Sequence, residues 1–108
     1  MAAGALDRRA QFRRATVGDD GFGQTEAWAD HGAVVWASRR DVSDAEKAGA
    51  GQVNATVMSR FRVRRSAFTA GLTAKDRFVC DGREWSITGL KETDRPGLIE
   101  ITATAGND

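Results

Sequence analysis

The residue types that most often carry out chemistry in proteins are few in this sequence and stand far apart. His31 is the only histidine and Cys80 the only cysteine among 108 residues. A catalytic thiol needs a nearby base, and a metal site needs several ligands at close spacing. The adjacent acids Asp19 and Asp20 are explained by the solubility of a loop. The sequence therefore predicts no catalytic residue, no metal site and no cofactor.

A row of arginines at alternate positions is the most prominent charged pattern. Arg60, Arg62 and Arg64 alternate with Phe61 and Val63, which in a β-strand places arginines on one face and apolar side chains on the other. The row could be a solvated face, a line of salt bridges to a neighbouring subunit, or a surface that faces DNA phosphates. Because Phe61 lies on the opposite face, the row lacks the interleaved aromatic rings of a platform for single strands.

Composition limits the class of protein. A chain of 108 residues with 41% hydrophobic content is expected to be one domain, residues 1–108. The formal net charge of +1 provides no global field that would attract nucleic acid or a membrane surface, and no apolar run approaches the roughly 20 residues of a membrane span. We expect Trp28, Trp36 and Trp85 in the core, with one of them at a subunit interface as the alternative.

The dipeptide Asp81-Gly82 lies between two alternating apolar stretches, which is a strong signal for a β-hairpin with a type I′ turn. Cys80, just before the turn, is expected to be a small buried hydrophobe. The alternation and the turn residues predict strands over residues 8–16, 25–28, 34–38, 53–66, 76–80, 84–90 and 98–103. This pattern predicts an all-β fold, a small barrel or sandwich of six to seven strands.

The segment from residue 39 to residue 54 interrupts this pattern between the third and fourth strands. Residues 41–48 are compatible with a short helix whose N-cap would be Asp41 or Ser43. An isolated helix of this length is marginal in water. We therefore expect a long arm that is either mobile or ordered by a partner.

Taken in order, these features resemble a known family. A basic first strand precedes a glycine-rich loop and Trp28; residues 34–37 and the arm follow; the arginine-alternating strand 60–64 and the hairpin segment 81–87 complete the pattern. This order, its spacing and the chain length resemble the phage head-tail joining family, also called head closure, head-tail adaptor or stopper proteins, of tailed phages and gene transfer agents. The resemblance covers roughly residues 6–104.

The resemblance implies a β-barrel virion protein without catalytic residues that forms a homo-oligomeric ring. The ring would join a portal or adaptor protein on the head side to a tail terminator or tail tube, with packaged DNA in its channel. It would be assembled in the host cytoplasm and help to retain the DNA, and six and twelve copies fit the sequence equally. The residues expected to form interfaces are Arg39, Arg40, Val42, Ala45, Glu46, Arg60, Arg62, Arg64 and Phe22.

An alternative from a different class is a small nucleic-acid-binding barrel of the OB or SH3-like type. It would use the arginine row of strand 60–64 to bind phosphate groups. Tight binding of DNA by the isolated monomer at low salt would favour this alternative over the connector hypothesis.

Overall fold

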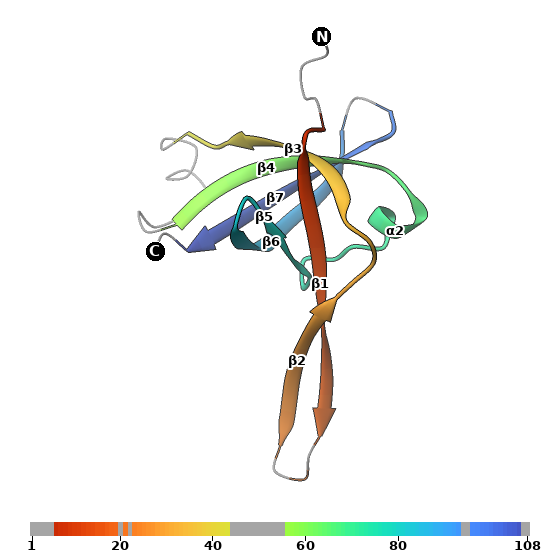
Figure 1. The fold of residues 1–108 in the computed structure, drawn as a ribbon, viewed down its shortest axis with the longest axis vertical. Helices are drawn as coiled ribbons and strands as arrows, with labels where there is room; N and C mark the ends of the chain where they lie inside the picture. Colours follow the sequence, from red (N-terminus) through yellow and green to blue (C-terminus); the bar gives the residue numbers. More distant parts are fainter. Residues whose placement is uncertain (1–5, 20, 22, 44–55, 94–95, 107–108) are drawn as a thin grey trace.

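Nearly all of the regular structure in the described chain is β-strand, which confirms the predicted all-β class. The structure is a computed structural model, and it describes residues 6–19, 21, 23–43, 56–93 and 96–106 (Figure 1). Within these ranges it has seven strands and one helix of four residues. In chain order these elements are β1 (Arg8–Asp19), β2 (Gln24–Asp30), β3 (Val35–Asp41), β4 (Thr56–Arg64), α2 (Ala67–Ala70), β5 (Arg77–Cys80), β6 (Arg83–Glu92) and β7 (Leu98–Gly106).

Six of the strands close into a barrel, and the seventh extends it. The sheet order is β2-β1-β3-β4-β7-β6-β5, and a further pairing between β1 and β5 closes the circle. All pairings are antiparallel. Within the barrel, closure leaves no free lateral edge, as in other small barrels. The prediction of a small barrel or sandwich of six to seven strands is thus confirmed, and the architecture is a barrel with β2 as the additional strand.

Strand β1 belongs both to the barrel and to a hairpin that extends away from it (Figure 1). Residues 8–10 of β1 pair with β3, residues 11–13 pair with β5, and residues 13–19 pair with β2. We call the hairpin formed by residues 13–19 and β2 the projecting ribbon. The sequence predicted this hairpin with a loop over residues 17–24, whereas the strands continue to Asp19 and resume at Gln24.

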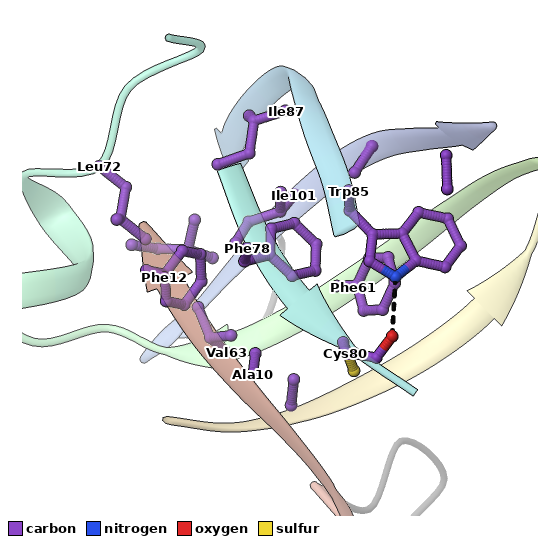
Figure 2. Close-up of a cluster of buried hydrophobic side chains, with 14 residues drawn as sticks. Ala10, Phe12, Phe61, Val63, Leu72, Phe78, Cys80, Trp85, Ile87 and Ile101 are labelled. Carbon is purple, nitrogen blue, oxygen red and sulfur yellow. Dashed lines mark hydrogen bonds between the residues drawn. The ribbon is translucent and has the colours of Figure 1, made fainter. Parts of the chain in front are cut away.

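The core is an aromatic cluster inside the barrel (Figure 2). Phe12, Phe61, Phe78 and Trp85 are fully buried, and the Phe61 ring lies 4.8 Å from the Phe78 ring and 4.9 Å from the Trp85 ring, edge to face in both pairs. Such contacts stabilise a core beyond the area they bury. The Trp85 indole N–H donates a 3.0 Å hydrogen bond to the Cys80 carbonyl. The buried positions of Trp85 and Cys80 confirm the prediction.

The hairpin between β5 and β6 has the predicted turn. Asp81 and Gly82 have φ angles of 55° and 76°, and Cys80 pairs with Arg83 across the turn. Two successive positive φ angles define a type I′ turn. The Asp81 carboxylate also accepts hydrogen bonds from Arg8 at 2.8 Å and Arg39 at 3.0 Å. The turn is therefore tied to the ends of β1 and β3.

A buried carboxylate fixes the segment between α2 and β5. Asp76 is 2% exposed and accepts two 2.8 Å hydrogen bonds from the Arg14 guanidinium and one of 2.9 Å from the Thr73 amide. The short helix before it begins with a capping box formed by Ser66 and Thr69. Neither this helix nor the Arg14–Asp76 pair was predicted from the sequence. The pair joins residues distant in the chain.

Trp85 should dominate the stability of the barrel. Replacing Trp85 by Ala leaves a cavity in the aromatic cluster, and such changes cost about 3–5 kcal/mol. We expect a loss in that range in the free energy of unfolding measured by urea denaturation. Trp36→Ala is the matched control, because that indole is 49% exposed, and it should cost less than about 1 kcal/mol. Equal losses in the two variants would contradict the assigned core.

Acid should weaken the fold through the carboxylates that accept hydrogen bonds from arginines. Burial raises the pKa of Asp76, but the hydrogen bonds from Arg14 and Thr73 outweigh it and lower the pKa below the ordinary value. The pKa of Asp81 is lowered in the same way by Arg39 and Arg8. A carboxyl whose pKa is lowered by folding contributes stability above its unfolded-state pKa of about 4, and that stability is lost as the pH falls through the folded-state pKa.

The expected result is that Asp76→Asn destabilises the protein at pH 7 and that its difference from wild type shrinks as the pH falls below about 4. Denaturation curves recorded from pH 7 to pH 2 measure this difference. Glu84→Gln, at an exposed ion pair 3.5 Å from Arg77, should change stability by less than about 0.5 kcal/mol. A constant difference between Asp76→Asn and wild type at all pH values would refute the linkage.

Candidate functional site

The outer surface of β1, β3 and β4 gathers most of the predicted arginines around one tryptophan. On β4 the side chains of Phe61 and Val63 are buried in the barrel, so the alternating arginines point outward, as predicted. The neighbouring strands add residues to the same surface. We call this surface the basic face, and it consists of Arg9, Trp36, Arg40, Arg60, Arg62 and Arg64.

A single glutamate neutralises part of the basic face. Glu100 lies on β7 directly opposite Arg62 and is 6% exposed. Its carboxylate oxygens are 3.4 Å from Arg62, 3.9 Å from Arg60 and 3.4 Å from Lys91. Three cations thus surround one carboxylate on the outside of the sheet, where cross-strand pairs of opposite charge stabilise the strands. This role of Glu100 was not predicted from the sequence, because its neighbours come from β4 and β6.

Trp36 lies on the basic face and not in the core. Its side chain is 49% exposed, and the Arg9 guanidinium lies 4.8 Å from the ring centroid in a cation–π contact. The prediction that Trp36 is a core residue was therefore wrong. In β3 the buried position is Ala37, and the alternation of side chains turns Trp36 outward. An exposed tryptophan among arginines has the composition of an interface hot spot.

The adjacent residues Arg39 and Arg40 lie on opposite faces of β3, which extends to Asp41 beyond the predicted strand end at residue 38. Arg39 points inward, where it lies 5.0 Å from the Trp85 ring centroid and bonds to Asp41 and Asp81, each at 3.0 Å. Arg40 points outward, opposite Arg60 on β4. Arg39 therefore covers one end of the aromatic core, whereas Arg40 belongs to the basic face.

The hydroxyl of Ser59 completes the polar cluster at that end of the barrel. Ser59 is fully buried and donates a 2.6 Å hydrogen bond to Asp41. This bond and the neighbouring Arg39 guanidinium lower the pKa of Asp41. Val42, one residue beyond the strand, is 8% exposed, and its amide donates to the Met58 carbonyl at 3.0 Å. The start of the predicted arm is thus anchored to β4.

The other predicted interface residues lie outside the described part of the chain. They are Phe22, Ala45 and Glu46, and the helix predicted for residues 41–48 lies largely outside it as well. Their assignment to an interface stays a prediction, as does that of the residues on the basic face.

A second surface lies where the projecting ribbon leaves the barrel. Here a hollow of about 630 Å³ separates β1 and β2 from the segment that precedes β5. Trp28 forms part of its wall and is only partly buried, so the prediction that it is a core residue was wrong. The Arg77 guanidinium lies 4.3 Å from the Trp28 ring centroid, and the indole N–H donates to Glu26 at 3.1 Å. Val17 on β1 also lines the hollow and is 64% exposed.

The residue types that could act as nucleophiles or metal ligands have structural contacts in the described chain. In the described ranges, no group of three or more His, Cys, Asp or Glu side chains could hold a metal ion. Burial raises the pKa of the Cys80 thiol, which keeps it protonated at neutral pH. His31 lies between β2 and β3, where its amide donates to the Phe12 carbonyl at 2.8 Å and its ring packs 5.0 Å from Phe68. No described helix is long and apolar enough to cross a membrane.

Comparisons with solved structures support the fold over nearly the whole chain. A chain from the virion of a native gene transfer agent particle is 23% identical, with a TM-score of 0.69, and the match covers 98% of this chain and 97% of that one. Protein SF1141 from Shigella flexneri 2a, known from a solution structure, is 25% identical, with a TM-score of 0.73 and coverage of 100% and 99%. No curated protein matches the sequence significantly.

A family model gives the assignment that the folds alone do not. The model described as phage head completion protein matches residues 1–106, almost the full 108 residues. The family resemblance seen in the sequence is confirmed by this match. The chain therefore belongs to the phage head completion protein family, whose members are structural proteins of the virion.

Proposed function

We propose that this protein is the stopper, or head closure protein, of a head-tail connector. It forms a homo-oligomeric ring between a portal or adaptor protein and the tail terminator or tail tube, and it helps to retain packaged DNA in the channel. It is assembled in the host cytoplasm and has no enzymatic activity. The observation that carries the proposal is the match to the head completion family over residues 1–106.

The architecture supports a role in which geometry, and not chemistry, is the mechanism. A closed barrel has no free lateral edges, so it keeps its shape while its outer surfaces carry contacts. In a cyclic ring each copy contacts the next through two different surfaces, and the ring has two unlike ends. Unlike ends suit a part that joins a head to a tail.

The basic face supplies a surface suited to contacts between subunits or with a neighbouring ring. Trp36 is half exposed, and Arg40 and Arg64 form no ion pair with a described residue, whereas Arg60 and Arg62 share Glu100. Tryptophan and arginine are the residues that most often dominate binding energy at interfaces. Carboxylates of a neighbouring subunit or ring would form ion pairs with Arg40 and Arg64.

A nucleic-acid-binding barrel is the second candidate, and one observation favours it. Trp36 lies on the same face as the arginine row, so an aromatic ring does stand beside the arginines. Phe61, the aromatic residue within the arginine row itself, is buried. A base could stack on the exposed indole while arginines contact phosphates, and such binding would weaken steeply with salt.

Labelled particles test the proposed function directly. In a strain whose own copy of this gene is deleted, we expect unjoined heads and tails, and complementation with a tagged chain should restore joined particles. Gold labelling of the tag should then mark the head-tail junction in negative-stain images. Label along the tail or over the whole head surface, or normal joining in the deletion strain, would refute the connector role.

Charge reversal on the basic face tests its use and separates the two candidates. We expect the double variant Arg40→Glu/Arg64→Glu to fold but to reduce joined particles about tenfold or more, because two interface arginines are each worth about 1 kcal/mol or more. Arg83→Glu, at an exposed position on β6, is the matched control and should have little effect. Fluorescence anisotropy of the isolated protein with labelled DNA is the second readout. Tight, salt-sensitive binding that Trp36→Ala abolishes would favour the nucleic-acid-binding candidate.

A further inference from the structure

We propose that the projecting ribbons of neighbouring copies pair edge to edge, with β1 of one copy accepting β2 of the next. The inference rests on the proposed ring and specifies its subunit contact. It names a second copy of this chain as the occupant of the hollow beside the ribbon. Three observations carry it: two backbone edges without a partner strand, a hollow beside one of them, and a lysine in that hollow without an ion pair among the described residues.

The first open edge belongs to β1. The Phe12 carbonyl accepts the His31 amide at 2.8 Å, and residues 13–19 of β1 pair onward with β2. Because backbone groups alternate between the two edges of a strand, the even-numbered residues of this stretch bond to β2. Ala15 and Val17 therefore direct their N–H and C=O groups to the other edge. Strand β5 pairs with that edge only as far as Arg13, and no described residue pairs with it beyond.

The second open edge belongs to β2. Ala15 lies directly opposite Trp28, and Val17 opposite Glu26. In an antiparallel pair that shares no hydrogen bonds, both residues point their backbone groups outward, so Glu26 and Trp28 present theirs on the far side of the ribbon. The only partner of β2 within the described chain is β1. On this edge the Trp28 carbonyl accepts a 3.1 Å hydrogen bond from the Arg13 guanidinium, which leaves the Trp28 N–H and the backbone groups of Glu26 for a partner strand. The ribbon thus carries two edges without a partner strand in the described chain, each a template for another strand.

The hollow leaves space for a strand at the β1 edge. It has a volume of about 630 Å³, and its lining includes Ala15 and Val17 from β1 together with Gly71, Thr73, Lys75 and Arg77. The segment before β5 turns away from β1 at this point, with Asp76 held to Arg14 by its carboxylate. A strand laid along Ala15 and Val17 would also cover the Val17 side chain, which is 64% exposed.

The lining of the hollow holds one lysine that a partner could pair with. Lys75 forms no ion pair with any described residue. The acids of β2 already have neighbours in their own chain: Glu26 lines the same hollow and accepts the Trp28 indole N–H, and Asp30 lies 3.6 Å from Arg13. A carboxylate of the incoming strand would therefore pair with Lys75.

The geometry of this contact matches that of a ring. When the ribbons of two neighbouring copies point the same way, β1 of one runs antiparallel to β2 of the other, as within the hairpin itself. The contact uses two different surfaces, so it repeats from copy to copy and gives a ring when the rotation between copies closes. Pairing of two β1 edges would be isologous and would end at a dimer.

A proline substitution tests the edge without breaking the hairpin. Val17→Pro removes an N–H that points away from β2, and proline is tolerated at the edge of a sheet. We expect the isolated variant to unfold at nearly the wild-type temperature and to reduce joined particles about tenfold or more. Val17→Thr keeps the N–H and a β-branched side chain and should join normally. Glu26→Pro, at the matching position of the β2 edge, should have the same effect as Val17→Pro.

Electron cryomicroscopy of the connector in intact wild-type particles gives the direct readout. Ribbons paired β1 to β2 around a ring are the expected result. A ring in which the edge at Ala15 and Val17 is empty, or is occupied by a strand of another virion protein, would overturn the inference and leave the proposed function intact. Absence of this chain from the connector would overturn both. Normal joining by folded Val17→Pro protein would also contradict edge pairing.

Discussion

The pairing of β1 with β5 is the contact on which the rest of the structure depends. It is three residues long, from Gln11 to Arg13, and it converts an open sheet into a barrel. Phe12 and Phe78 lie opposite each other in this pairing, and their rings are 5.2 Å apart inside the core. The short ladder therefore closes the hydrogen-bonding circle and joins two sides of the aromatic cluster. Without it, β1 and β5 would be exposed edges.

The same pairing decides where the barrel ends and the projecting ribbon begins. Strand β1 is 12 residues long, whereas β5 is four residues long and stops pairing at Arg13. From Arg14 onward β1 is held by β2 alone on one edge and by the Arg14–Asp76 pair at its base. A short strand beside a long one thus produces both a rigid body and an extension. The buried carboxylate of Asp76 fixes the direction in which the extension leaves.

Much of the barrel could be predicted from local pattern. Asp81-Gly82 specifies its own turn, and the alternation of Phe61 and Val63 with arginines specifies which face of β4 is buried. The errors came from positions whose burial depends on distant partners. Trp36 is large and apolar, but the next residue of β3, the small Ala37, is the one that points into the core, so Trp36 points outward. Trp28 lies on the ribbon beyond the core. Glu100 and Asp76 acquire their roles only from arginines on other strands.

The distribution of arginines connects the fold to its role in the virion. Those that point inward or lie at the base of the ribbon, such as Arg14 and Arg39, are satisfied by carboxylates of the same chain, so they stabilise the subunit. Arg40 and Arg64 on the basic face have no such partner among the described residues, and no described strand pairs with either outer edge of the ribbon. A monomer selected for solubility alone would protect such edges. Bonding capacity left open on a closed, rigid barrel is what a part made for assembly requires.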